Sequence, residues 1–479
     1  MNFDAFDLKR SVPPTSNIFY ASDLKRSAPP TSNPTRRGNK MLRKFDLFHL
    51  GLIFLIVVFF IMFPFPVASA KWSLTPRFYV EGMYDDNIFL TERHEKDDFI
   101  TTISPGVNLS YEAPTGEINL DYEYRRSFYD DFPELDFSAH RGRAEARKDF
   151  APWFGAEVRE TFIRSQDPIE LTGLEEFERP SIRIGMRNRY IRNIVEPEAT
   201  FRFGENRSIR FGYRNNILRN KAIDIADQDE NAANALLIFR FNISNGIEVF
   251  YEHINQEYQK TVPPSVDEDF DGDEIRGRYT HYFNPRVSAF IEHRYYQRNF
   301  DRKSAGVVDY VVHDPSGGIV LEPYENMRLS AQAGYAVRDA EGRKDEGAFS
   351  GRGDLSASYK HLTVSLYGES GFDEDYLSAE RLGFNEFWRA GFSGRYDLLE
   401  RLWAEGFFYI GRDRFVDIDR GDSLWSARGS LNYGILRWLF LSFDYEHNVR
   451  DSNIPLESFR DNRYFGRITA QYDIAERFQ

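Results

Sequence analysis

The sequence predicts an all-β protein, a transmembrane antiparallel up-and-down β-barrel of about twenty strands. Three observations predict it: runs of about ten residues that alternate apolar and polar side chains, short links that alternate with long acidic connections, and tyrosines that recur at one end of the runs. Such runs are typical of outer-membrane strands, which face lipid on one side and water on the other. Eighteen strands is the next choice for the count.

The clearest alternation lies between residues 424 and 447. Its apolar phase consists of Trp425, Ala427, Gly429, Leu431 and Tyr433, and then, after a short link, Leu439, Leu441, Phe443 and Tyr445. The positions between them are mostly Ser, Arg, Asn, Asp and Glu. In a soluble sheet the apolar face would need a second layer to cover it, and the chain offers no such layer. The stretch therefore predicts a transmembrane hairpin.

Composition agrees with a barrel. Aromatic residues make up 16% of the chain and charged residues 28%, while the mean hydropathy is negative, which excludes a helical membrane protein. The absence of cysteine excludes disulfides and thiolate metal sites. The net charge is −14, and because residues 1–70 carry +5, residues 71–479 carry −19. Such an acidic chain argues against a nucleic-acid partner.

The first seventy residues are expected to lie outside the barrel. Residues 7–17 recur almost unchanged as residues 23–33, and we expect the polar, Pro-rich segment 1–40 to be disordered and to precede the true start at Met41. Residues 41–70 have the pattern of a signal peptide, with a basic start, an apolar run and a cleavage site at residues 68–70. An uncleaved anchor helix is the alternative. The barrel would occupy residues 71–479.

Two kinds of connection are expected between the strands. The short links are residues 113–116, 204–207, 243–246, 284–286, 324–326, 360–361, 398–401 and 435–437. The long connections are residues 91–98, 166–180, 221–231, 261–274, 339–347, 372–385, 412–422 and 450–462. Outer-membrane barrels place short turns in the periplasm and long loops outside. Between residues 182 and 202 we expect either one long strand or a strand broken at Glu196 and Pro197.

Tyrosine recurs in the apolar phase where strands reach the short links. A phenol body in lipid with its hydroxyl at the headgroups explains this placement, so we predict a periplasmic aromatic girdle. Its members are Tyr111, Tyr359, Tyr396, Tyr433 and Tyr472. The alternative is that tyrosine is simply a favoured strand residue.

Arginine and acidic residues recur in the polar phase, which in a barrel faces the lumen. One interpretation is a wet lumen whose transverse field holds anionic or sugar substrates. The other is that any wide barrel fills its interior with ion pairs, many of them of little energetic consequence. The candidate pore-lining residues are Arg141, Arg143, Arg147, Arg210, Arg214, Arg276, Arg352, Asp354, Arg395, Arg428 and Arg467.

The sequence gives little support for a metal site or a catalytic site. Asp267, Asp269, Asp271 and Gly272 match the first half of a calcium loop, but Arg278 stands where the bidentate Glu belongs, so a solvated acidic loop is expected and calcium binding stays a hypothesis. No H-E-x-x-H or G-x-S-x-G pattern occurs. The sequence therefore predicts no enzyme, no catalytic residue, no metal site and no cofactor. Four histidines near strand ends in or near the apolar phase are explained as polar tips at the membrane interface: His253, His281, His293 and His447.

The start of the predicted barrel carries a family resemblance. Pro76 is followed by a run of Tyr84, Asp85, Asp86, Asn87, Ile88 and Phe89. This opening resembles that of outer-membrane β-barrel porins often encoded with exopolysaccharide assembly genes. The resemblance implies a pore or export channel in the bacterial outer membrane and brings no catalytic residues.

Two functions follow as expectations. One is a porin or export channel that passes solute or polysaccharide through a polar lumen. The alternative is a surface adhesin or structural barrel that acts through its long acidic loops. A continuous lumen would favour the first function, and a lumen closed by inward loops the second. Expected partners are outer-membrane lipid and lipopolysaccharide, the barrel-assembly machinery and exopolysaccharide.

Overall fold

The computed structural model describes residues 71–170, 181–182, 187–222, 225–259, 269–301, 307–375 and 383–474. The expected upstream segment and signal peptide, residues 1–70, lie outside these described residues. No helix within the described part is long and apolar enough to cross a membrane.

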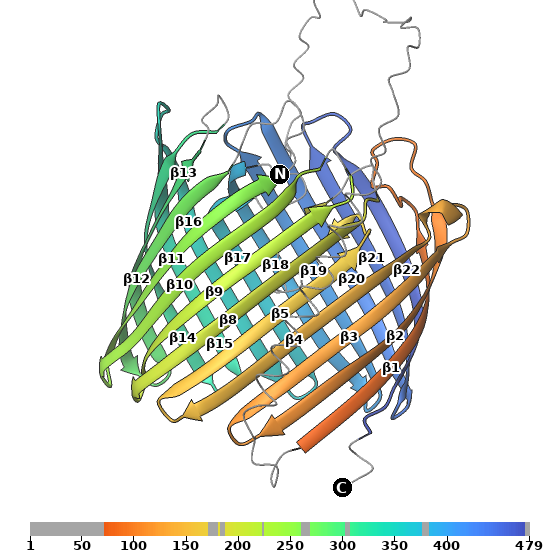
Figure 1. The fold of residues 1–479 in the computed structure, drawn as a ribbon, viewed down its shortest axis with the longest axis horizontal. Coiled ribbons are helices and arrows are strands. Elements are labelled where there is room, and N and C mark those ends of the chain that lie inside the picture. Colours follow the sequence, from red (N-terminus) through yellow and green to blue (C-terminus); the bar gives the residue numbers. More distant parts are fainter. Residues whose placement is uncertain are drawn as a thin grey trace, which may run out of the picture. The chain divides into compact units, whose positions relative to one another are not determined.

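Twenty strands form one closed antiparallel sheet (Figure 1), as the sequence predicts. Each strand pairs with its neighbours in chain order, and β1 closes the barrel by pairing with both β2 and β22. The strands are β1 (Lys71–Asp85), β2 (Asp98–Ala113), β3 (Gly116–Tyr129), β4 (Phe137–Ala151), β5 (Phe154–Ser165), β8 (Tyr190–Gly204), β9 (Arg207–Asn220), β10 (Asp227–Asn242), β11 (Asn245–Gln259), β12 (Phe270–Asn284), β13 (Val287–Phe300), β14 (Tyr310–Tyr324), β15 (Met327–Ala340), β16 (Glu346–Tyr359), β17 (Leu362–Asp375), β18 (Gly383–Leu399), β19 (Leu402–Phe415), β20 (Arg420–Leu436), β21 (Leu439–Ser452) and β22 (Phe459–Gln471). Two short strands, β6 (Ile169–Glu170) and β7 (Ser181–Ile182), pair separately, and a 3₁₀ turn, η2 (Pro133–Leu135), precedes β4.

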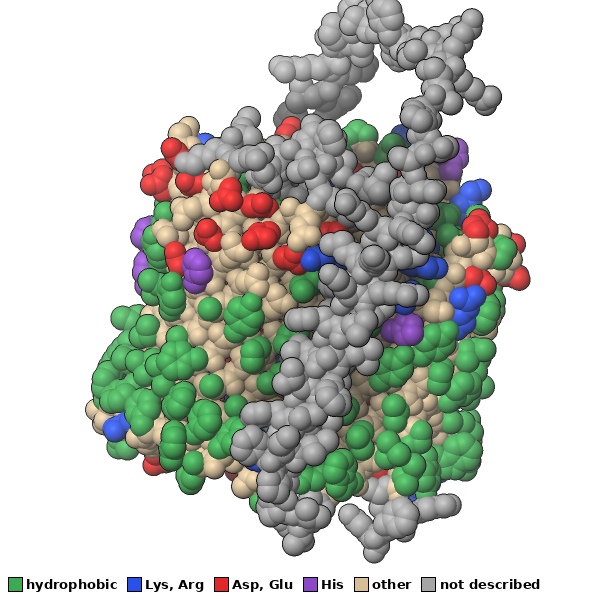
Figure 2. Space-filling view, viewed as in Figure 1, with side chains coloured by type: hydrophobic (Ala, Val, Ile, Leu, Met, Phe, Trp, Pro, Cys, Tyr) green, Lys and Arg blue, Asp and Glu red, His purple; other side chains and the backbone are tan. Residues whose placement is uncertain are grey.

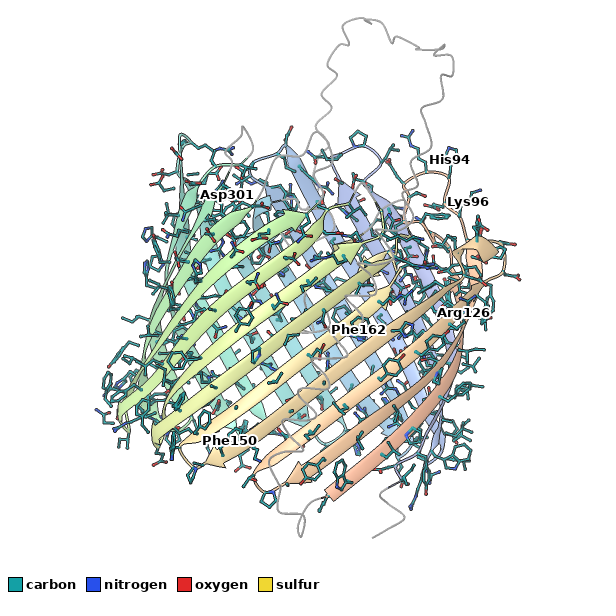
Figure 3. The ribbon with its side chains drawn as sticks, viewed as in Figure 1. His94, Lys96, Arg126, Phe150, Phe162 and Asp301 are labelled. Carbon is teal, nitrogen blue, oxygen red and sulfur yellow. The ribbon has the colours of Figure 1, made fainter. Side chains whose placement is uncertain are left out.

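The two ends of the barrel differ. At the lower end in Figure 1, which we call the turn end, links of two residues join the strands, as between β2 and β3. All eight predicted short links lie there, and a ninth, Pro152 and Trp153 between β4 and β5, escaped prediction. At the opposite, loop end the connections are longer. Figure 3 marks this end by His94, Lys96 and Asp301, while Phe150 lies near the turn end.

The strands run further toward the loop end than the sequence predicts. β12 already begins at Phe270, inside the predicted connection 261–274, and β21 and β22 reach to Ser452 and Phe459. At this end the outward positions of several strands are polar, as with Asn255 and Asp271. A strand that is polar on both faces loses the alternation by which it is recognised, so six of the eight predicted loops were too long. The connections from β1 to β2 and from β5 to β8 are instead longer than predicted.

The segment around Pro197 combines the two predicted alternatives. β8 is one continuous strand that pairs with β5 throughout, including Val158 opposite Pro197. On the other side its pairing with β9 skips from Val195 to Glu198. Proline has no backbone N–H to donate to a ladder, which accounts for an interrupted pairing without an interrupted strand.

The outer face carries the apolar phase of the strands. On β1, Leu74, Phe78 and Val80 are exposed, and the same phase continues around the barrel. Figure 2 shows a belt of hydrophobic side chains in the half nearer the turn end, with acidic side chains and histidines above it. This is the surface that a barrel presents to the hydrocarbon core of a membrane.

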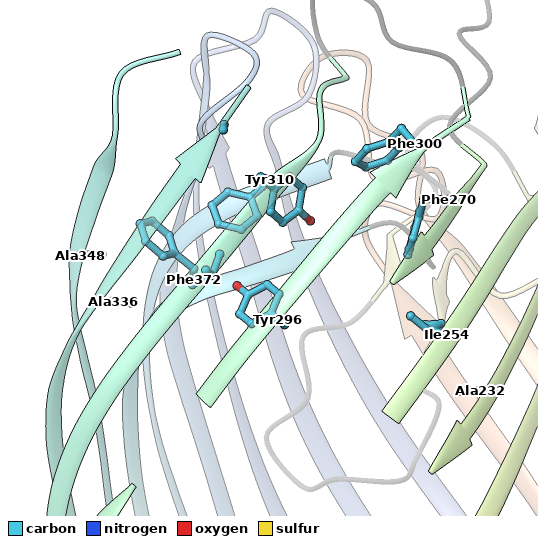
Figure 4. Close-up of a cluster of buried hydrophobic side chains, with 12 residues drawn as sticks. Ala232, Ile254, Phe270, Tyr296, Phe300, Tyr310, Ala336, Ala348 and Phe372 are labelled. Carbon is cyan, nitrogen blue, oxygen red and sulfur yellow. The ribbon is translucent and has the colours of Figure 1, made fainter. Parts of the chain in front are cut away.

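Apolar burial is concentrated on the inner wall at the loop end. The largest buried cluster contains Phe270, Tyr296, Tyr310, Phe372 and Phe384, which come from β12, β13, β14, β17 and β18 (Figure 4). A barrel of this width has no ordinary core, so this cluster fills one side of the loop-end interior.

Candidate functional site

The predicted pore-lining residues all lie on the inner face. Arg428 binds Asp444, Arg467 binds Glu81 and Arg210 binds Glu198, each on another strand of the same wall. The complete set is Arg141, Arg143, Arg147, Arg210, Arg214, Arg276, Arg352, Asp354, Arg395, Arg428 and Arg467. They share this face because side chains two apart along a strand point the same way.

Some of these arginines stand over aromatic rings of the inner wall. The guanidinium carbon of Arg276 lies 5.2 Å from the ring centre of Phe250, and that of Arg352 lies 5.6 Å from Tyr367. Nearer the turn end, the guanidinium of Arg395 lies 4.8 Å from Trp403. Such stacking holds a cation in place without neutralising it. The side chain of Arg352 is 54% exposed, so the wall here is wet.

The loop-end interior is instead tightly packed. Arg298 of β13 donates to Glu374 of β17 at 2.7 Å, and the Tyr310 hydroxyl of β14 donates to the same carboxylate. Arg338 of β15 donates at 3.0 Å to Asp417, which lies between β19 and β20. Only 1% of the Arg338 side chain is exposed. These bonds join strands that are not neighbours and so cross the interior rather than follow the wall.

On the other side, the connection between β1 and β2 folds inward. Ile88 and Leu90 are completely buried. Leu90, at a positive φ of 52°, packs against Tyr409 of β19, Leu424 of β20 and Phe459 of β22. Ile88 instead packs against Ile100 of β2 and Tyr129 of β3, so the segment, residues 86–97, contacts the inner wall on both sides of β1.

The family-like opening motif forms the base of this inward segment. The Asn87 amide donates to the carbonyl oxygens of Thr91 and Arg460, both at 2.8 Å, and accepts from the Thr91 backbone N–H. Asp85 accepts from the Asn87 backbone N–H at 2.9 Å, and Asp86 accepts from Asn462. These residues thus fix the path of the chain as it leaves β1.

A second segment meets the first. Arg187, just before β8, donates to the Ile88 carbonyl oxygen at 2.7 Å and to the Tyr129 hydroxyl at 2.6 Å. Its guanidinium lies 3.5 Å from Asp85, and both side chains are buried. We call this group, Asp85, Ile88, Leu90, Tyr129 and Arg187, the mouth cluster. Sequence reasoning singled out Asp85 and Ile88 in the opening motif but missed the cluster, because Tyr129 and Arg187 lie far away in the chain.

On the outer face, three Tyr-x-His pairs share a structural feature. Tyr251 and His253 both donate to the same oxygen, Oδ1 of Asp273, at 2.8 and 3.0 Å. The other two pairs are Tyr279 with His281, which meet on Oδ1 of Asn245, and Tyr445 with His447, which meet on Oδ1 of Asn462. We call each triplet a Tyr-x-His node. These histidines face outward, as their place in the apolar phase predicts, and their position at a membrane interface stays a prediction. The shared acceptor on a neighbouring strand depends on register and was not foreseen.

The predicted girdle tyrosines lie at the turn end, in the outward phase. Tyr359, Tyr396, Tyr433 and Tyr472 are exposed there. Tyr111 is buried, and its ring centre lies 4.5 Å from that of Trp72.

The predicted acidic loop is partly strand. Asp267 lies outside the described residues, but β12 includes Asp271 and Asp273 on the outer face, where they accept from Asn255 and Tyr251. Residues two apart in a strand are separated by about 7 Å, so these carboxylates do not wrap around an ion as in a calcium loop. Within the described residues no group of three or more His, Asp and Glu side chains could hold a metal ion.

A family comparison agrees with a porin-like barrel. The family described as "Putative beta-barrel porin 2" matches residues 264–472, which include β12 to β22. No curated protein matches the chain. Solved structures with a similar course include the siderophore receptor PirA from Pseudomonas aeruginosa, with 10% identity, a TM-score of 0.49, and 83% of this chain and 80% of that chain covered. OccAB2 from Acinetobacter baumannii has 12% identity and a TM-score of 0.39, with 84% of this chain and 98% of that chain covered.

The closed barrel, its apolar outer belt and the family match lead to one conclusion. The chain is a porin-like β-barrel of the bacterial outer membrane.

Proposed function

We propose that the barrel passes small polar solutes across the outer membrane by diffusion along its inner wall, with no chemical step. The observation that carries this proposal is the contrast between the two faces at mid-height. Lumen-facing arginines such as Arg352 and Arg428 are about half exposed, while the outer face is apolar. Charged side chains with this exposure need water around them, and a water-filled interior is what solute passage requires.

The loop end sets the size of the solute in this proposal. The mouth cluster and the bonds of Arg298 and Arg338 narrow the interior there, so small solutes are favoured over polymers. Passage of an exopolysaccharide would require residues 86–97 to leave the inner wall. The same proposal includes export of the chain and its insertion by the barrel-assembly machinery. It also includes contact of the outer rim and the tyrosine girdle with lipopolysaccharide and lipid headgroups.

A structural or surface barrel is the second candidate, and the packed loop-end interior favours it. For an adhesin the segment 86–97 is a poor binding surface, because Ile88 and Leu90 are buried inside rather than displayed. Other loops would have to carry the binding.

Swelling of proteoliposomes in neutral sugars distinguishes the two candidates. The folded chain is reconstituted, and swelling rates are compared for arabinose, a disaccharide and a tetrasaccharide, with liposomes that hold unfolded chain as the control. We expect rapid swelling in arabinose and a swelling rate that falls steeply from arabinose to the tetrasaccharide. No swelling in any sugar, with a folded and inserted barrel, would reject the channel and leave the structural barrel.

A further inference from the structure

The ion pairs in the middle of the lumen are arranged asymmetrically. The guanidinium faces the water and the carboxylate lies beneath it: 45% of the Arg428 side chain is exposed, against 5% for its partner Asp444. For Arg214 and Glu230 the values are 31% and 0%. The same order holds for Arg278 with Glu292, Arg294 with Glu274, Arg352 with Glu369 and Arg467 with Glu81.

This arrangement, in which the arginine is more exposed than its carboxylate partner, has a structural cause. The buried carboxylates are also held by wall residues: Asp444 accepts from Ser430, and Glu230 accepts from Asn216. A short acidic side chain stays near the backbone, while the longer arginine reaches over it into water. Arg77 with Asp121 and Arg389 with Glu369 have the opposite order, and Arg147 with Glu117 at the turn end is evenly exposed.

Two further arginines add charge that no carboxylate balances. Within the described residues, neither Arg141 nor Arg276 has an acidic partner at ion-pair distance. Glu123, opposite Arg141, is already bound by Arg125 at 2.5 Å. Arg276 stands opposite another arginine, Arg294, whose guanidinium is engaged by Glu274. Like charges placed opposite each other are unfavourable in a sheet, and here both remain.

We propose that the lumen selects anions, with carboxylate- and phosphate-bearing solutes as the class it passes best. The surface that a solute meets at mid-height is lined by guanidinium groups, even though the chain as a whole carries −14. Low-dielectric walls focus such a field onto the water between them. Guanidinium groups also bind carboxylate and phosphate oxygens in pairs of parallel hydrogen bonds. This inference depends on the proposed channel.

The test is the reversal potential in planar bilayers under a KCl gradient. We expect a chloride-to-potassium permeability ratio of about 2 or more for the unchanged chain, and a current that citrate reduces. The double variant Arg141→Gln, Arg276→Gln should lower the ratio by roughly half, because it removes the two unbalanced charges. Arg93→Gln is the control, since Arg93 is an exposed position of segment 86–97 at the loop end and its removal should leave the ratio unchanged.

The outcomes separate the two proposals. Conductance with a ratio at or below one, or with no response to citrate, overturns anion selection and leaves the channel intact. A folded barrel without any conductance overturns both. Heat-modified migration in detergent shows that each variant is folded. The effect of charge is separated from that of shape by comparing Arg276→Glu with Arg276→Gln, because Arg276→Glu should give the lower permeability ratio.

Discussion

On the outer face of this barrel, single oxygen atoms join side chains of neighbouring strands. In each Tyr-x-His node a phenol and an imidazole from one strand meet on one Oδ1 of a neighbouring strand. Asp273 supplies that oxygen in one node, while Asn245 and Asn462 supply it in the others. An amide oxygen therefore takes the same place as a carboxylate oxygen in these nodes. Polar atoms with partners of their own can remain at an interface where water is scarce.

The first prediction concerns Asp273, which also accepts from Gln297. Asp273→Ala removes the acceptor of Tyr251, His253 and Gln297, so we expect the free energy of unfolding to fall by about 1–3 kcal/mol. Asp273→Asn keeps Oδ1 for Tyr251 and His253 and gives up only the Oδ2 acceptor of Gln297, so its loss should be smaller, about 0.5–1 kcal/mol. Urea unfolding in lipid vesicles, followed by tryptophan fluorescence, measures both. Equal losses in the two variants would show that charge, and not the shared oxygen, holds the node.

At the scale of the strands, the nodes also mark the thickness of the membrane belt. On β11, Asn245 belongs to the turn-end node and His253 to a loop-end node, eight residues further on. That is about 27 Å along the strand, and at an ordinary barrel tilt about 20 Å across the membrane. The apolar band of outer-membrane barrels is about 25 Å tall, so the two nodes lie near its edges.

The start of β1 gives the second prediction. β1 begins at Lys71, which pairs with Glu112, and residues 68–70 have the pattern of a signal cleavage site. We expect the chain isolated from outer membranes to begin at Lys71, because export and cleavage precede folding of the strand. Mass spectrometry of the intact chain decides this. A mass that includes residues before 71 would favour the uncleaved anchor.

The strands could be read from the sequence because their signal is local. Alternation along 439–445 shows which face is apolar without knowledge of the neighbouring strands. Contacts of Leu90 with Phe459, or of Arg338 with Asp417, join residues far apart in the chain and carry no local pattern. The inner position of the arginines was predictable because alternation along one strand already separates the two faces. Their position above buried carboxylates was not, because it depends on register between strands.

The whole molecule is asymmetric along its axis, with a wet, arginine-lined interior at mid-height and a packed interior at the loop end. Arg187 connects the two inward segments of the mouth cluster through Ile88, Tyr129 and Asp85. Arg187→Gln should loosen this connection and widen the narrowest part of the path. Lys96→Gln, which removes the same charge from an exposed position in segment 86–97, should not.

Single-channel conductance of the refolded chain in planar bilayers tests the central claim most directly, that a barrel with a packed loop-end interior is nevertheless a channel. We expect stable steps for the unchanged chain and for Lys96→Gln, and larger, noisier steps for Arg187→Gln. A correctly folded and inserted barrel that stays silent in all three forms would contradict the account, because neither the wet mid-lumen nor the mouth cluster would then belong to a path across the membrane.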